Sequence, residues 1–170
     1  MDRISKTAPV GNSASELYDS DYYAWIEGQV TALREHRVEE IDWANVAEEI
    51  EDLGKSQKHS VESHMARIAE HLLKLAYASA RMKGLNRRGW ELSIREARHQ
   101  IRKLLGESPS LRGKTPELFG DAYESGRNVA LNALNLPDSA LPETSPWTVE
   151  QVLDDGFVPN GPANSGHSNK

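Results

Sequence analysis

The chain has 170 residues, contains no cysteine and carries a formal net charge of −6. The lack of cysteine excludes disulfides, thiolate metal ligands and cysteine nucleophiles. No apolar run reaches the ~20 residues that cross a bilayer, and residues 1–15 lack the apolar segment of a secretory signal. We expect a cytoplasmic protein that does not contact a membrane and is large enough for one core.

The charge is unevenly distributed along the chain. Residues 1–73 hold 7 basic and 15 acidic side chains, residues 74–114 hold 11 basic and 3 acidic, and residues 115–170 hold 2 basic and 8 acidic. The acidic segment of one copy can attract the basic segment of a second copy. The distribution therefore favours self-association or a charged protein partner.

The first predicted helix begins at about Asp19 or Ser20, either of which can cap its free N–H groups, and runs to about His36. A second helix is predicted over residues 42–53, with Asp42 as its cap and Gly54 where a left-handed C-terminal residue is needed. Apolar residues recur at helical spacing along this second helix and predict its inner face. They are Trp43, Val46, Ala47, Ile50 and Leu53.

The longest apolar stripe lies between Ser56 and Arg81. This segment contains neither Pro nor Gly, so it predicts one helix, about 39 Å long at 1.5 Å per residue. Other helices must cover such a stripe, so we expect this helix at the centre of the fold. It either meets helix 42–53 at a tight antiparallel corner or continues it as one kinked rod, and we favour the corner. The stripe consists of Val61, Met65, Ile68, Leu72 and Leu75.

Two further helices should cover the central one. Residues 82–89 contain two glycines and predict a turn, which is followed by a helix over about 88–105. Thr115 and the proline after it predict the start of the last long helix. That helix should end before Pro137.

Closely spaced prolines after residue 136 predict an extended C-terminal arm that wraps the bundle. Thr148 can cap a short helical turn over 149–153 within this arm. Trp147 and Phe157 are its predicted anchors, because buried aromatic rings fasten a segment that has little secondary structure of its own.

No segment alternates apolar and polar residues as a half-buried strand would. The sequence therefore predicts an all-α fold, a helical bundle of about five helices around one long central helix, with a Pro-rich C-terminal arm. We expect a single helical domain at residues 16–158, between disordered tails at 1–15 and 159–170.

Several segments together resemble a known bacterial family. In order, they are IDW (41–43), EEIEDLG (48–54), HLLK (71–74), SPSL (108–111) and PWTVEQVL (146–153). Over about residues 17–159 the chain is similar to the family named domain of unknown function 29. The resemblance implies a helical fold, and it carries over no catalytic or binding residue.

His64 and His71 lie two helical turns apart on the central helix, and Glu48 and Glu49 lie on the preceding one. Helical bundles build di-metal sites from imidazole and carboxylate groups on facing helices, so these four residues are a candidate transition-metal site. The central helix lacks the Glu-x-x-His pairs that such sites use. The alternative is that both histidines flank the core and bond to acidic neighbours, and we predict no cofactor.

Arg88, Arg95 and Arg102 recur at seven-residue spacing, with Arg98 beside them. An arginine face of this kind can contact the phosphates of a nucleic acid. The acidic remainder of the chain opposes such binding, and no known nucleic-acid-reading motif is present. The alternative is that the arginines pair with the acidic helix 42–53, pair with another subunit, or only keep this face of the helix in contact with solvent.

The sequence contains no Gly-x-Ser-x-Gly elbow, no phosphate-binding glycine loop and no dinucleotide fingerprint. We therefore expect a non-catalytic adaptor that binds another macromolecule, either a protein partner or a second copy. One alternative is a metal- or ligand-binding helical enzyme that uses the candidate metal site. The other is a nucleic-acid binder that uses Arg95, Arg98 and Arg102.

Overall fold

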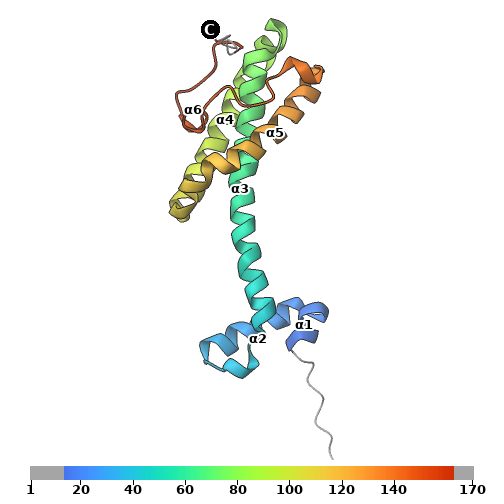
Figure 1. Cartoon of the computed structure of the whole chain (residues 1–170), viewed down its shortest axis with the longest axis vertical. Coiled ribbons are helices and arrows are strands. Elements are labelled where there is room, and N and C mark those ends of the chain that lie inside the picture. Colours follow the sequence, from blue (N-terminus) through green and yellow to red (C-terminus); the bar gives the residue numbers. More distant parts are fainter. Residues whose placement is uncertain (1–13, 163–170) are drawn as a thin grey trace, which may run out of the picture. The chain divides into compact units, whose positions relative to one another are not determined.

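The computed structural model describes residues 14–162, which contain six α-helices and no strand (Figure 1). The all-α prediction is confirmed. Most of the two predicted tails, residues 1–13 and 163–170, lies outside the described residues. The helices are α1 (Ala14–Ser20), α2 (Tyr22–Arg34), α3 (Trp43–Tyr77), α4 (Ala80–Glu107), α5 (Thr115–Leu134) and α6 (Val149–Leu153). Short 3₁₀ helices lie at Val38–Glu40, Pro109–Lys114 and Asp138–Ala140.

The chain divides into two compact units, Met1–Lys55 and Ser56–Lys170. We call their described parts the N-terminal unit (residues 14–55) and the C-terminal unit (residues 56–162). The helix α3 contributes residues to both units. The single domain over residues 16–158 stays a prediction.

The predicted corner at Gly54 is wrong, because α3 is helical without interruption from Trp43 to Tyr77. Glycine weakens a helix interior by about 1 kcal/mol relative to alanine. It ends a helix when it adopts the left-handed backbone of a C-terminal cap, and Gly54 does not have a positive φ. The extra helical residues on either side therefore outweigh its low propensity.

The predicted turn at residues 82–89 is also wrong, because these residues are helical. The break between α3 and α4 falls at Ala78 and Ser79 instead. The Ser79 hydroxyl accepts a hydrogen bond from the Met82 backbone N–H at 3.3 Å and so caps α4. A serine cap begins the helix earlier than the glycines suggested, because it satisfies a backbone donor that would otherwise be free.

In the N-terminal unit, a buried glutamine ties α2 to the loop before α3. The Gln29 side chain donates a hydrogen bond to the Glu40 carbonyl at 3.4 Å and accepts one from the Asp42 backbone N–H at 2.8 Å. The Asp42 carboxylate accepts a hydrogen bond from the Asn45 backbone N–H at 3.4 Å, which confirms Asp42 as the cap. The cap of α2 is Asp21 and neither of the predicted residues, Asp19 and Ser20.

The C-terminal unit holds the main core. The predicted central stripe is confirmed, because its five members are buried. One hydrophobic cluster joins them to side chains of α4, α5 and the segment after α5. From α4 these are Ile94, Ala97 and Ile101; from α5, Leu118, Phe119, Ala122, Tyr123, Ala130 and Leu131; from the C-terminal segment, Leu141, Trp147 and Val152.

A glycine sets the distance between α5 and α3. A Cβ atom at Gly126 would lie 2.4 Å from the Ala66 carbonyl oxygen and 2.9 Å from the Glu70 backbone nitrogen. These distances are shorter than van der Waals contact, so the two helix backbones pack against each other without a side chain between them. Any larger residue at position 126 would push the helices apart.

The segment after α5 packs onto the core through aromatic and aliphatic side chains. Trp147 and Val152 are buried, and the Phe157 ring packs edge-on against Trp147 with ring centres 6.1 Å apart. The short helix α6 matches the predicted turn, and Thr148 and Gln151 form a capping box at its start. The Pro-rich arm, with Trp147 and Phe157 as its anchors, stays a prediction.

Candidate functional site

The apolar stripe at the start of α3 is exposed. Trp43, Ile50 and Leu53 have exposed fractions of 58, 67 and 64%. The predicted inner face of helix 42–53 is therefore wrong. The physical reason lies in the N-terminal unit itself, where α1 and α2 are short and the buried apolar residues of α2 are Trp25 and Ala32.

An apolar groove runs between α2 and the first turns of α3. Its volume is about 240 Å³. Two polar side chains, Gln29 and Glu49, are the exceptions in a lining that is otherwise aliphatic and aromatic. We call this feature the apolar groove; its apolar lining consists of Tyr22, Trp25, Ile26, Val30 and Leu33 from α2 and Val46 and Ile50 from α3.

One end of the groove is fixed by an aromatic cluster around Glu49. The carboxylate of Glu49 accepts hydrogen bonds from the Tyr18 hydroxyl at 2.8 Å and from the Tyr22 hydroxyl at 2.6 Å. The bond to Glu49 raises the pKa of Tyr18 to about 12. The Trp25 ring packs on both tyrosines, with ring centres 4.8 Å from Tyr18 and 5.8 Å from Tyr22. This cluster holds Glu49 and α2 in place.

The surroundings of the groove are strongly acidic. Residues 14–55 contain twelve acidic and three basic side chains, a net charge of −9. Two of the basic side chains already pair with carboxylates: Arg37 with Glu35 at 2.9 Å and Lys55 with Asp52 at 2.6 Å. An apolar groove inside an acidic unit suits a ligand that is apolar on one side and basic around it.

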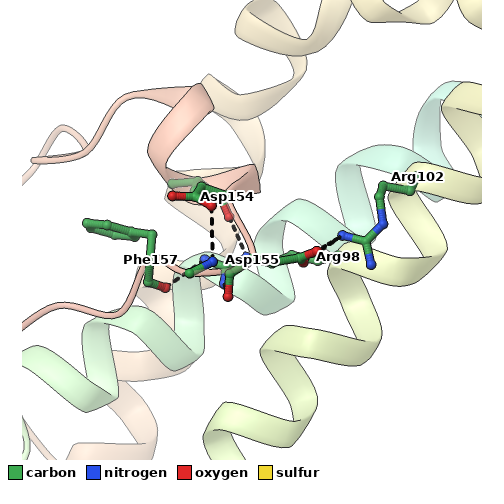
Figure 2. Close-up of polar contacts among 7 residues, drawn as sticks. Arg98, Arg102, Asp154, Asp155 and Phe157 are labelled. Atoms are coloured by element: carbon green, nitrogen blue, oxygen red, sulfur yellow. Dashed lines mark hydrogen bonds and ion pairs between the residues drawn. The ribbon is translucent and has the colours of Figure 1, made fainter.

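The predicted placement of Arg98 on an exposed arginine face is wrong, because the structure buries it to 2% exposure. Its guanidinium donates hydrogen bonds to the backbone carbonyls of Val152 at 2.8 Å, Asp155 at 3.4 Å and Phe157 at 3.0 Å (Figure 2). Burial lowers the pKa of Arg98, and the carboxylates of Asp155 and Asp154 oppose this effect. Arg98 therefore fastens residues 152–157, and its donors face backbone carbonyls.

The other predicted arginines divide between two environments. Arg102 points to Asp155, and its Nη1 donates to both carboxylate oxygens at 2.5 and 2.6 Å (Figure 2). That bond holds the pKa of Asp155 below its usual range. Arg88 and Arg95 lie on the exposed surface of α4. Nucleic-acid binding stays an untested alternative, and Arg98 is not among the residues that could contact a phosphate.

The four residues of the candidate metal site, His64, His71, Glu48 and Glu49, do not form a recognisable set of metal ligands in the described part of the chain. Among residues 14–162, no group of three or more His, Asp or Glu side chains is placed to hold a metal ion. Glu49 bonds to two tyrosines, as described above, while Glu48 is exposed. Burial lowers the pKa of both His64 and His71, which lie half-buried beside the core stripe. Metal binding by these residues stays an untested hypothesis.

Sequence reasoning missed Arg127, a second buried arginine. Its guanidinium donates hydrogen bonds to the Pro142 carbonyl at 2.9 Å and to the Asp138 carboxylate at 2.7 Å. The Tyr123 hydroxyl donates to the same Pro142 carbonyl at 2.8 Å. Arg127 interrupts the apolar face of α5, and that interruption is the signal that could have revealed a buried, hydrogen-bonded arginine.

The comparison with known families places the chain. The model of the family described as Domain of unknown function DUF29 matches residues 17–158. The chain belongs to this family. No curated protein and no solved structure matches it. In this DUF29 chain, none of the helices among residues 14–162 is both long and apolar enough to cross a membrane.

Proposed function

We propose that this DUF29 chain is a non-catalytic protein-binding protein whose apolar groove takes a basic amphipathic helix of a partner. The observation that supports the proposal is the exposed stripe at the start of α3. Three large apolar side chains, Trp43, Ile50 and Leu53, recur there at helical spacing and remain more than half exposed. Ile50 lines the groove, and Trp43 and Leu53 extend the same apolar stripe along α3. Covering apolar surface is favourable by roughly 25 cal/mol per Å², so a partner that covers the stripe gains affinity from it.

The shape of the groove favours a helix as the ligand. Its apolar lining comes from two neighbouring helices, with α2 contributing side chains from Tyr22 to Leu33. An amphipathic helix that lies in such a groove buries residues three and four positions apart on one face. The ligand helix, α2 and α3 would then share one apolar core, and the stripe on α3 would be buried in it.

The charge of the N-terminal unit favours a basic ligand. Its net charge of −9 would repel an acidic helix and attract one that carries Lys or Arg beside its apolar face. Most of these carboxylates are exposed. Exposed charges act mainly on the rate of encounter and are screened by salt, so the apolar contact should provide most of the residual affinity at high salt.

The test uses the full chain and a fluorescent helical peptide of about 14 residues, about four turns. The peptide consists of leucines at helical spacing on one face and lysines elsewhere. We expect saturable binding by fluorescence anisotropy, which weakens as salt is raised. A peptide of the same composition in scrambled order should bind much more weakly, because it has no apolar face.

Variants of the groove separate specific binding from simple attraction to an acidic protein. Leu33→Ser together with Ile50→Ser changes exposed groove residues and leaves the charge unaltered, so it should abolish saturable binding. The matched control is Val129→Ser, an exposed apolar residue of α5 outside the groove, which should leave binding unchanged. Equal binding of both peptides, or undiminished binding to the groove variant, would overturn the proposal.

A further inference from the structure

A second uncovered feature lies on α4 in the C-terminal unit. Arg81, Leu85, Arg88, Leu92 and Arg95 follow one another at steps of four and three residues, so they form one line along the helix. All five are exposed, and the two leucines have exposed fractions of 78 and 59%. We call this line the α4 stripe.

The composition of the α4 stripe matches the ligand expected for the apolar groove. It presents two leucines that the C-terminal unit does not cover, and each is flanked along the helix by arginines. The helix as a whole, Ala80–Glu107, contains eight basic and three acidic side chains. It is therefore a basic amphipathic helix that belongs to the same chain as the acidic groove.

The dimensions also agree. The α2 wall of the groove extends from Tyr22 to Leu33, which is about 16 Å at 1.5 Å per residue. The α4 stripe extends from Arg81 to Arg95, about 21 Å on the same scale. The two leucines lie within this length, with an arginine at each end to meet carboxylates beyond the apolar lining.

We propose that the groove of one copy binds the α4 stripe of a second copy. This inference rests on the proposed function, because it names the helix that the groove takes. Two copies can exchange these contacts reciprocally, groove to stripe and stripe to groove, as the two-fold symmetry of most homodimers requires. Groove-to-groove pairing is disfavoured, because it would bring together two units that each carry a charge of −9.

Self-association of this kind would regulate access to the groove. While a second copy's α4 stripe occupies it, another protein's helix has to displace that stripe before binding. Because both contacts combine apolar burial with exposed opposite charges, the dimer should dissociate on dilution and as the salt concentration rises.

The test is sedimentation velocity of the full chain over a range of concentrations at low and at high salt. We expect a dimer at low salt that dissociates on dilution. Leu85→Ser with Leu92→Ser, or Leu33→Ser with Ile50→Ser, should weaken the dimer at least about tenfold, since each pair removes two large apolar contacts. Val129→Ser is the control and should leave the dimer unchanged.

Mixing the two double variants tests the pairing directly. One variant keeps its groove and the other keeps its stripe, so the mixture can form one of the two contacts, whereas each variant alone can form neither. We expect a heterodimer in the mixture at a concentration at which each variant alone is monomeric. Far-UV circular dichroism checks that the variants fold. If a double variant does not fold, the single variant Leu92→Ser or Ile50→Ser is used in its place.

Two results would overturn the inference. One is a wild-type monomer at every concentration and salt, and the other is a dimer that neither double variant weakens. Failure here is distinguishable from failure of the proposed function, because the stripe variant has an unoccupied groove. If the wild type is monomeric and the leucine–lysine peptide still binds, only the self-association is wrong. If the peptide fails to bind the stripe variant, the groove itself is not a helix-binding site.

Discussion

Leu72 and Leu53 lie on the same helix and belong to equally regular apolar stripes, but Leu72 is fully buried and Leu53 is 64% exposed. Around Leu72, α4, α5 and the C-terminal segment close a core. Around Leu53, the N-terminal unit leaves the stripe exposed on an acidic surface. A regular apolar stripe therefore indicates that burial of that helix face is favourable, and it does not show whether residues of the same chain bury it.

The largest difference between the units should appear when a leucine in each stripe is shortened. Leu72→Ala removes buried methyl groups and leaves a cavity, so it should lower the free energy of unfolding by about 2–5 kcal/mol. Leu53→Ala should change it by less than about 0.5 kcal/mol. Urea unfolding followed by circular dichroism, at a protein concentration low enough to keep the chain monomeric, measures both. Equal losses would mean that Leu53 packs against its own chain.

The next largest difference in stability should appear when a buried arginine of the C-terminal unit and an exposed arginine of the N-terminal unit are each replaced. Arg98→Met leaves three carbonyls of the C-terminal segment without a charged donor, and we expect a loss of about 2–4 kcal/mol after the apolar replacement offsets part of the cost. Arg37→Met in the N-terminal unit removes ion pairs on an exposed surface and should shift the urea midpoint much less.

Limited proteolysis gives the Arg98 prediction a second measurement. If Arg98 fastens the segment after α6, the Arg98→Met variant should be cleaved there faster than the wild type while the helical bundle survives. An unchanged cleavage pattern together with an unchanged urea midpoint would show that the three carbonyl contacts do not hold this segment.

Replacing a glycine by alanine in each unit tests how closely its helix packs against its neighbours. Gly126→Ala places a methyl group against the α3 backbone and should cost about 1–3 kcal/mol, because two helices have to separate. Gly28→Ala on α2 meets no atom within 4 Å and should stabilise the helix by up to about 1 kcal/mol. Thermal unfolding should therefore show opposite shifts in Tm. Shifts of the same sign would contradict the close approach of α5 and α3.

The smallest expected effect is the pH dependence that His71 contributes to the C-terminal unit. Burial lowers the pKa of His71 below its ordinary value of 6.5, with Lys74 and Arg67 acting in the same direction and Glu70 opposing them. The unfolded chain then binds the proton more readily than the folded chain does. The stabilising contribution is therefore present above the unfolded-state pKa and decreases as the pH falls through it, until the folded state is protonated too.

A matched pair of histidine variants measures this effect. His71→Leu should flatten the loss of stability between about pH 8 and pH 5, measured by urea unfolding at intervals across that range. His59→Leu changes a side chain that is 77% exposed and should leave the profile close to that of the wild type. A profile that both variants change equally would remove the role assigned to the burial of His71.

Local rules allowed part of this structure to be predicted from particular residues. The spacing of Val61, Met65, Ile68, Leu72 and Leu75 predicted a buried face, and Asp42 and Thr148 were correctly expected as caps. The candidate site was predictable only in its parts. Val46 and Ile50 of the groove were predicted as part of the inner face of helix 42–53, whereas the exposure of Ile50 was not foreseen.

The sequence by itself determined the helical class, the central stripe and the caps Asp42 and Thr148, because these depend on interactions within a few residues of the chain. Tertiary structure alone decided that Arg98 is buried, that Gly126 touches α3 and that the first stripe of α3 is exposed. Each of these depends on which distant segment arrives at a given helix face. Helical periodicity shows that a face is apolar, and only the packing of the remaining chain shows whether anything covers it.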